Sequence, residues 1–359
     1  MSEPVNVHDY EQAARAALDP DVFDYFAGGA GDEITLAENL EAFRRTFLRP
    51  RVLVDGSQCS MATSVLTTEL AWPVMIAPLA YLRVARAEGE LAVARAARET
   101  ETLYCVSSLA TTAPEHIAAE LAGAAWWFQL YPYRDRGRTR EIVARARAAG
   151  CLALVVTVDA PRLGRRERDL RNAFTLPQLE LPCVPIPPGK ERVTPADVNA
   201  LFDERLDWNA LEELSSIAEL PVVVKGVLTG EDASLAPEYG AAALIVSNHG
   251  GRQLDGVPAT LDVLTEVVEA AGVEVYLDGG IRRGADVVKA LGLGARAVLV
   301  GRPIVWGLAV DGSAGVRGVL ETLRSELELT LALSGCPDIR ELSAAIVERQ
   351  TTVSERRRG

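Results

Sequence analysis

Eight short apolar runs, nearly all followed by a stretch with helical periodicity, set the strongest constraint on how this 359-residue chain folds. Each run is rich in aliphatic or aromatic residues and has the length of a buried strand. Eight strand–helix units in series predict a closed parallel (β/α)8 TIM barrel rather than an open sheet. The predicted strands are Trp72–Ala77, Leu103–Ser107, Trp126–Leu130, Leu152–Thr157, Pro221–Lys225, Ala243–Ser247, Val273–Leu277 and Ala297–Val300.

One interval between these strands is much longer than the others. It runs from Ala160 to Asn209 and contains the proline-rich run Leu181–Gly189, which cannot form regular structure. Because it follows the fourth strand, we expect this long loop to form a wall or lid over the mouth of the barrel. Helices are predicted at Glu88–Arg98, Pro114–Leu121, Thr139–Ala149, Leu211–Ala218, Glu231–Pro237, Leu261–Ala270 and Ala285–Leu291.

The rest of the chain is predicted to decorate the barrel, so that residues 1–359 form a single domain with the barrel at 71–340. Residues 1–70 form an N-terminal helical extension followed by a hairpin, and the arginine-rich tail 351–359 is expected to lack ordered structure. The predicted additions are helices Asp9–Leu18 and Leu36–Phe47, a hairpin within Val52–Leu70 that closes the bottom of the barrel, and helix Gly315–Leu333.

Composition excludes several classes of partner. The net charge of -13 argues against nucleic acid as the main ligand. No apolar run reaches the roughly 18–20 residues that cross a bilayer, and the start has no secretory pattern. The five cysteines are scattered without CxxC spacing, which indicates free thiols in a reducing compartment. We therefore expect a cytoplasmic protein that contacts neither membranes nor nucleic acid.

Polar residues cluster where the predicted strands end. In a TIM barrel the carboxyl ends of the strands meet at one mouth, so these side chains are expected to form a site. A barrel that is only structural has no need for a lysine, a histidine and acidic residues at one rim. The candidates are Ser107, Ser108, Gln129, Tyr131, Thr157, Asp159, Lys225, Ser247, Asn248, His249, Asp278 and Arg302.

Glycines and arginines follow the seventh and eighth strands, in Leu277–Gly284 and Val300–Pro303. Barrels commonly bind a phosphate there through backbone N–H groups and a helix N-terminus, and arginine adds a bidentate clamp. A dinucleotide site of the Rossmann type does not fit, because Gly292-Leu-Gly294 lacks a third glycine and precedes a strand.

These residues resemble those of a known family, the FMN-dependent 2-hydroxy-acid oxidases and dehydrogenases, which include glycolate, lactate and hydroxymandelate oxidases. The most specific match is the stretch SNHGGRQLD at 247–255. Further matches, in family order, are Asp24–Ala30, Met75–Ala80, Phe128–Tyr131, Thr157–Arg166, Val224–Gly226 and Asp278–Arg282.

The resemblance implies a role for each matching residue. The backbone of Pro78, Leu79 and Ala80 would line the flavin ring, which would be hydrogen-bonded by Ser107, Gln129, Thr157, Lys225 and Ser247. Asp278 would hold the ribityl chain, and Gly279, Gly280, Arg282, Gly301 and Arg302 the phosphate. The substrate carboxylate would lie between Arg166 and Arg252 with Tyr25 beside it, and Tyr131 would contact the substrate hydroxyl. A homotetramer is implied by resemblance alone.

The chemistry asks for the same residue types. Oxidising a 2-hydroxy acid requires a base whose pKa lies near neutrality, for which His249 is the natural candidate. Asp159 is expected to stabilise the protonated imidazole, and Lys225 to favour the reduced flavin. His8 and His116 lie in helical stretches away from the mouth and are interpreted as ordinary surface or structural residues. Hydride transfer and a carbanion route both remain open.

Two positions depart from the family pattern. Leu109 stands where glycolate oxidase-like members carry a tryptophan, and Tyr81 where smaller residues are common. The leading interpretation is an oxidase that uses O2 as electron acceptor and releases peroxide. The alternatives are a dehydrogenase with another acceptor, a decarboxylating monooxygenase, and an FMN-binding protein without turnover.

Overall fold

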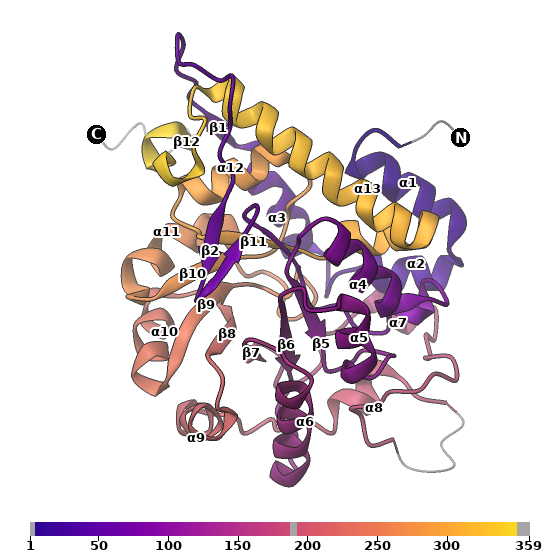
Figure 1. Cartoon of the computed structure of the whole chain (residues 1–359). Helices are drawn as coiled ribbons and strands as arrows, with labels where there is room; N and C mark the ends of the chain where they lie inside the picture. Colours follow the sequence, from indigo (N-terminus) through magenta and orange to yellow (C-terminus); the bar gives the residue numbers. More distant parts are fainter. Residues whose placement is uncertain (1–3, 187–191, 350–359) are drawn as a thin grey trace.

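The computed structural model describes residues 4–186 and 192–349, and the predicted tail 351–359 lies outside the described residues. Eight strands close into a parallel barrel in the order β10-β11-β4-β5-β6-β7-β8-β9 (Figure 1), which confirms the predicted fold class. Each strand overlaps its predicted range. The bounds are β4 Val74–Ile76, β5 Tyr104–Ser107, β6 Trp126–Leu130, β7 Leu154–Thr157, β8 Val222–Val227, β9 Ala241–Val246, β10 Glu274–Leu277 and β11 Ala297–Val300.

The inside of the barrel is a packed core. Alternate strand residues point inward, among them Met75, Trp127 and Tyr276, and all three are fully buried. The rings of Trp127 and Tyr276 lie 5.6 Å apart across this core. The other strand face is buried under helices, which explains why the strands are apolar throughout rather than alternating.

The surrounding helices mostly match the predicted ones (Figure 1). The last helix does not, because it begins at Arg302 directly after β11 instead of at Gly315. Asp311 and Gly312 leave helical geometry, with Gly312 at φ 53°. This kink interrupts the helical periodicity, so the pattern in the sequence predicted only the part of the helix after it. The bounds are α4 Gly89–Glu99, α5 Pro114–Leu121, α6 Arg136–Ala148, α9 Trp208–Ala218, α10 Gly230–Leu235, η2 Ala236–Tyr239, α11 Thr260–Ala271, α12 Gly284–Gly292 and α13 Arg302–Ser334.

Three helices precede the barrel: α1 Val7–Ala17, α2 Pro20–Ala27 and α3 Ile34–Arg44. Helix α2 was not predicted, although Pro20 at its first position is a typical start. The predicted helix Leu36–Phe47 runs too far. Its end belongs to β1 Thr46–Leu48, which pairs antiparallel with β12 Val347–Arg349, so a partner distant in sequence overrides the local pattern.

The predicted hairpin is shorter than expected, with β2 Thr63–Val65 paired to β3 Thr68–Leu70. Val65 and Leu70 pack against the inward-facing residues of the barrel strands. The Leu66 N–H donates to Glu274 at the first residue of β10, which places the hairpin at the bottom of the barrel as predicted. Before it, Val52 and Leu53 are fully exposed in an irregular loop.

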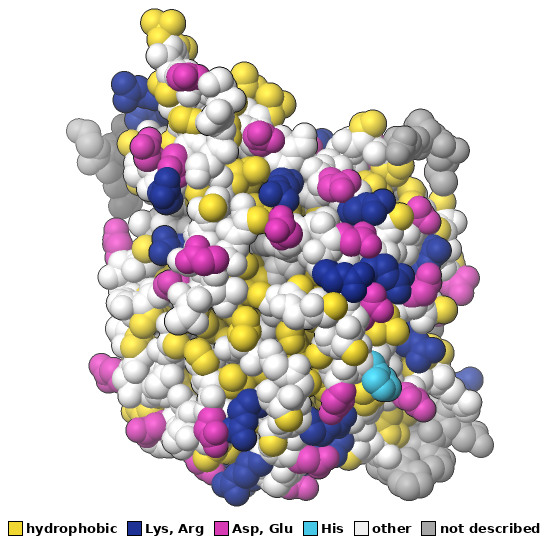
Figure 2. Space-filling model, viewed as in Figure 1, with side chains coloured by type: hydrophobic (Ala, Val, Ile, Leu, Met, Phe, Trp, Pro, Cys, Tyr) yellow, Lys and Arg dark blue, Asp and Glu magenta, His cyan; other side chains and the backbone are white. Residues whose placement is uncertain are grey.

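The long loop after β7 forms part of the wall of the mouth. Its described residues include two short helices, α7 Glu167–Arg171 and α8 Pro195–Asn199. Short 3-10 turns follow β4 at η1 Leu82–Val84 and lie between α13 and β12 at η3 Ile339–Glu341 and η4 Ala344–Ile346. Within the described ranges no helix is long and apolar enough to cross a membrane. Figure 2 shows basic and acidic side chains intermixed over one face, so the negative net charge is not gathered into one patch there.

Candidate active site

One cavity opens at the carboxyl ends of the barrel strands, and most of the predicted site residues line it. Five predicted residues do not line it: Ser108, Gln129, Asp159, Ser247 and Asn248. Gln129, Asp159 and Ser247 each hydrogen-bond a side chain that does line the cavity, whereas Asn248 bonds Asn39 of α3 and the buried hydroxyl of Ser108 has no partner among the described residues. The predicted residues in the wall are Tyr25, Pro78, Leu79, Ala80, Ser107, Tyr131, Thr157, Arg166, Lys225, His249, Arg252, Asp278, Gly279, Gly280, Arg282, Gly301 and Arg302.

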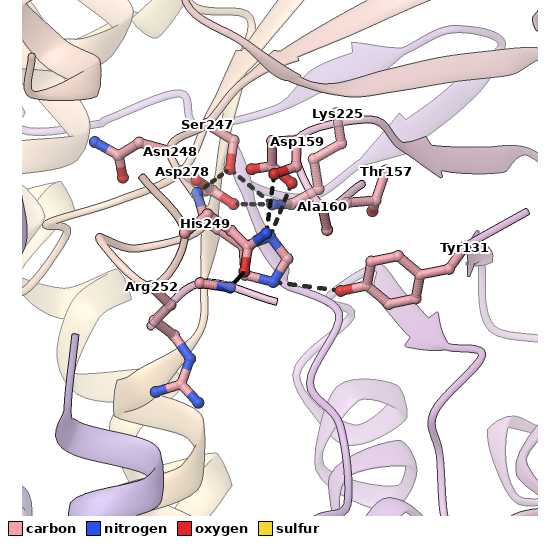
Figure 3. A network of polar contacts seen from close by, with 12 residues as sticks. Tyr131, Thr157, Asp159, Ala160, Lys225, Ser247, Asn248, His249, Arg252 and Asp278 are labelled. Atoms are coloured by element: carbon pink, nitrogen blue, oxygen red, sulfur yellow. Dashed lines mark hydrogen bonds and ion pairs between the residues drawn. The ribbon is translucent and has the colours of Figure 1, made fainter. Parts of the chain in front are cut away.

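His249 follows β9 and is held on both sides of its ring (Figure 3). Its Nδ1 lies 2.9 Å from Oδ1 of Asp159, and its Nε2 lies 3.3 Å from the hydroxyl of Tyr131. The backbone of His249 is left-handed at φ 58°, a conformation in which histidine is enriched among non-glycine residues. With Nδ1–H donating to the carboxylate, Nε2 faces the cavity as a proton acceptor.

The charges of this pair are set by burial and by each other. Burial lowers the pKa of His249, and attraction to Asp159 offsets only part of that effect. The pKa of Asp159 lies below its usual range: burial alone would raise it, but His249 and Lys225 outweigh burial. At neutral pH the site therefore contains a neutral imidazole next to an ionised carboxylate.

Lys225, near the end of β8, is a buried cation with two fixed partners (Figure 3). Its Nζ donates to Ser247 Oγ at 2.7 Å and lies 2.8 Å from Oδ2 of Asp278. Burial alone would lower the pKa of Lys225, but Asp278 and Asp159 raise it above its ordinary value. The other carboxylate oxygen of Asp278 is buried without a hydrogen-bond partner among the described residues, so it can accept from a ligand.

A chain of polar side chains connects β5, β6 and β7 at the same mouth. Ser107 Oγ donates to Gln129 Oε1 at 3.1 Å, and Gln129 Nε2 donates to Thr157 Oγ1 at 3.0 Å. Gln129 thus orients the two hydroxyls that line the cavity. The three residues come from neighbouring strands: Ser107 lies directly opposite Gln129, and Thr157 lies two residues beyond Val155, the partner of Gln129 on β7.

Two arginines approach the substrate end of the cavity. Arg252 donates to the backbone oxygens of Tyr25 and Gly28 at 2.6 and 2.8 Å, and its guanidinium lies 5.1 Å from the centre of the Tyr25 ring. Burial and the neighbouring Arg166 lower the pKa of Arg252 to about 10. Among the described residues, neither arginine has a carboxylate within ion-pair distance. Such a buried pair of cations is suited to an anionic ligand.

The structure decides which of two adjacent arginines points inward. Arg166 is buried and lines the cavity, whereas the side chain of Arg165 is 75% exposed and pairs with Glu167. The position assigned from the sequence is therefore the one that faces the site.

Arg282 and Arg302 lie at the end of the cavity expected to bind phosphate. Burial lowers the pKa of both, and neither has an ion-pair partner within the described part of the chain. Arg302 donates to the backbone oxygens of Phe26, Gly28 and Gly250 at 2.9–3.0 Å. These carbonyls orient the guanidinium but do not neutralise its charge.

The glycines near these arginines are needed for a reason that the sequence did not reveal. Gly279 and Gly280 have φ of 91° and 86°, and a Cβ on Gly280 would lie 2.1 Å from the backbone oxygen of Asn39. Gly280 therefore allows α3 to pack against the loop after β10, while a Cβ on Gly279 would lie 2.9 Å from the hydroxyl of Thr260 in α11. Gly301 has φ -106° and ψ -88°, outside the helical and extended regions, although an added Cβ would have no neighbour closer than 3.7 Å.

Apart from Arg166, the cavity residues contributed by the long loop were not predicted from the sequence. Phe202 lines the cavity and stacks on Tyr131 with 4.6 Å between ring centres. Leu163 and Asn199 line it as well, and Phe174 stacks on Tyr25 at 4.7 Å. The prolines of this loop indicated a wall, but an irregular segment has no periodicity that identifies its inward-facing residues.

The barrel and its mouth define a class of protein: a TIM-barrel enzyme with a buried histidine–carboxylate pair and with buried arginines that have no carboxylate partner among the described residues, as suits anionic ligands. The chain belongs to the FMN-dependent dehydrogenase family, whose model matches residues 14–349. It is 48% identical over 361 residues to an L-lactate oxidase of Nostoc sp., covering 97% of this chain and 99% of the relative. It is 49% identical over 347 residues to glycolate oxidase 3 of Oryza sativa subsp. indica, covering 94% of each chain.

Solved structures of related enzymes have the same fold as this chain. A mandelate oxidase with (S)-4-hydroxymandelic acid superposes with a TM-score of 0.91 at 42% identity, covering 97% of this chain and 100% of the other. The family and these relatives make the protein an FMN-dependent enzyme of the 2-hydroxy-acid oxidase group.

Proposed function

We propose that this enzyme oxidises an (S)-2-hydroxy acid to the 2-oxo acid and passes the two electrons to O2, so that each turnover releases one molecule of H2O2. The observation that carries the proposal is the placement of the His249–Asp159 pair in the same cavity as two arginines without carboxylate partners among the described residues. A base next to an anion site suits a substrate with a hydroxyl beside its carboxylate.

Each side chain has a definite task in this reaction. Arg166 and Arg252 hold the substrate carboxylate, and the Tyr25 side chain closes the same end of the cavity. His249 Nε2 accepts the hydroxyl proton, next to the hydroxyl of Tyr131 at 3.3 Å. Asp159, 2.9 Å from Nδ1, stabilises the imidazolium that forms. FMN, when bound, supplies the two-electron acceptor.

The residues around the remaining part of the cavity fit FMN. The free oxygen of Asp278 can accept from a ribityl hydroxyl, and the buried guanidiniums of Arg282 and Arg302 suit a phosphate. Lys225 brings a fixed positive charge to the ring. The remaining residues that we assign to the cofactor are Pro78, Leu79, Ala80, Ser107, Gln129, Thr157, Ser247, Gly279, Gly280 and Gly301.

The electron acceptor is tested by the balance of products. We expect O2 consumed, H2O2 formed and 2-oxo acid released in equal amounts, because Ala80 lines the cavity and resembles the alanine of the family's oxidases at this position. The three quantities and carbon dioxide are measured in one vessel, with catalase in a parallel run. Stoichiometric carbon dioxide with catalase present would indicate a decarboxylating monooxygenase. Turnover only with an artificial acceptor would indicate a dehydrogenase. If no 2-hydroxy acid lowered the flavin absorbance, the protein would be an FMN-binding protein without turnover.

Leu109 leads us to expect a substrate larger than glycolate. It lines the cavity where related oxidases carry an indole, so an apolar substrate side chain can be buried there. We expect kcat/KM for mandelate or a medium-chain 2-hydroxy acid to exceed that for glycolate by roughly tenfold or more. Steady-state kinetics with the three acids test this order. Leu109→Trp should reverse it, and an unchanged order in that variant would rule out the explanation.

The scattered cysteines, all free thiols, are compatible with a cytoplasmic location, and the family resemblance supports a homotetramer. We infer both. Light scattering on the purified enzyme tests the assembly.

A further inference from the structure

A second cavity lies against the active site, and one side chain belongs to the walls of both. Tyr81, directly after the loop that follows β4, lines the active-site cavity and also the second cavity. The other described walls of the second cavity come from the long loop after β7. Two of these residues are polar, Gln178 and Glu180, and the others are apolar: Leu176, Pro177, Leu179, Leu181, Val184, Ile186 and Val193. Its volume of about 510 Å³ lies within the usual range of ligand pockets.

Tyr81 is held rigidly between the two cavities. Its N–H donates to the backbone oxygen of Leu109 at 3.1 Å, and its side chain is only 2% exposed. Its backbone is left-handed at φ 59°, which is uncommon for an aromatic residue and persists only where the surroundings impose it. The carboxylate of Glu90 imposes it by accepting from the N–H groups of Leu82 and Thr111, which ties the two loops together.

The position of Tyr81 relative to the substrate follows from its neighbours. Its ring lies 6.2 Å from that of Tyr25, which contacts the arginine assigned to the carboxylate. Leu109, whose small size leaves room for a substrate side chain, is hydrogen-bonded to the backbone of Tyr81 and lines the same cavity. A substrate side chain that extends past Leu109 therefore meets the Tyr81 ring, and the apolar second cavity lies behind it.

We propose that Tyr81 determines the substrate specificity of this enzyme by setting the longest side chain that it accepts. The ring ends the substrate cavity, so the preferred class is aliphatic 2-hydroxy acids of intermediate length. Removing the ring joins the second cavity to the first. This inference rests on the proposed oxidation of 2-hydroxy acids and adds a length limit to it.

The test is a series of straight-chain 2-hydroxy acids from three to ten carbons, with kcat/KM measured for each. In the wild type we expect kcat/KM to rise by up to about fourfold per methylene and then to fall once the chain reaches Tyr81. In Tyr81→Ala the maximum moves to longer chains, and kcat/KM for the eight-carbon acid relative to the four-carbon acid rises by roughly tenfold or more. Tyr81→Phe keeps the ring and should keep the wild-type position of the maximum.

Two further measurements connect the effect to the second cavity. Val184 lines the second cavity, so adding Val184→Phe to Tyr81→Ala takes up part of its volume, and we expect it to return the maximum to shorter chains. Dissociation constants of straight-chain 2-oxo acids are measured by perturbation of the flavin absorbance. In each variant, the chain length that binds most tightly should be the one that gives the highest kcat/KM. This binding series needs no turnover.

The outcomes separate this inference from the proposed function. A wild-type flavin that no 2-hydroxy acid reduces would overturn the proposed function, while the binding series would still report the length limit. A Tyr81→Ala enzyme with full flavin content and the wild-type chain-length profile would overturn the role of Tyr81. The role of Tyr81 would also be overturned if Tyr81→Ala gained activity on long chains and the added Val184→Phe left that gain unchanged.

Discussion

His249→Gln is expected to bind FMN like the wild type and to lose kcat by roughly 10²–10⁴-fold. Glutamine can still hydrogen-bond Asp159, so the wall of the cavity keeps its shape, but an amide cannot accept the substrate proton. The rate constant for anaerobic flavin reduction by the best substrate, measured by stopped flow, reports this step directly. Flavin content, read from the absorbance spectrum, shows that the site is intact.

The matched control is His116→Gln. His116 is exposed on α5, as expected from the sequence, so this variant should reduce its flavin at the wild-type rate. If His249→Gln were as fast as His116→Gln, another group would have to be the base.

The pH dependence gives an independent view of the same residue. The base acts only when it is neutral, and burial holds the pKa of His249 below its ordinary value. Activity should therefore be full above that lowered pKa and fall as the pH drops through it, with the acid limb of kcat/KM lying below the range of an ordinary histidine. His249→Gln should lack this limb.

The stretch 247–255 shows how much of a site one sequence motif can encode. Besides the base and Arg252, three of its residues act through structure. Asn248 exchanges hydrogen bonds with Asn39 of α3 at 2.8 Å, and the side chain of Asp255 accepts from the N–H of Thr35 in the same helix. Gln253 accepts from Gly164 and donates to the backbone oxygen of Asp159, which pins the start of the long loop. The motif is specific because it joins catalysis to the packing of two distant segments.

The barrel could be predicted because each strand and helix carries its own local pattern. The residues at the ends of the strands could then be predicted to surround the mouth of the barrel, since all parallel strands of a closed barrel end on one side. The parts that could not be predicted depend on contacts between distant segments. Tyr25 belongs to α2, outside the barrel, and only family resemblance placed it in the site. Gly280 was expected near a phosphate, yet its contact with Asn39 is visible only once α3 is in place.

Lys225→Met is expected to slow flavin reduction by roughly 10²–10³-fold. In the proposed assignment the lysine would supply a fixed, buried positive charge beside the flavin, which gains negative charge on accepting electrons. Its Nζ lies 2.8 Å from Asp278, and the carboxylates of Asp278 and Asp159 raise its pKa, so the charge is present throughout the working pH range. Methionine fills a similar volume without charge. Stopped-flow reduction and the midpoint potential of the bound flavin measure the effect, and the potential should fall.

Removing this cation also leaves Asp278 as a buried carboxylate without its partner, which is destabilising and should weaken FMN binding. The kinetics are therefore measured with excess FMN, after flavin content is restored. Lys289→Met is the control, because Lys289 donates to the backbone oxygen of Phe43 from α12 and does not line the cavity. A reconstituted Lys225→Met enzyme with the reduction rate and potential of Lys289→Met would show that Lys225 only completes the packing around Asp278. A lowered potential with a slowed reduction would assign its charge to the electron-transfer step itself.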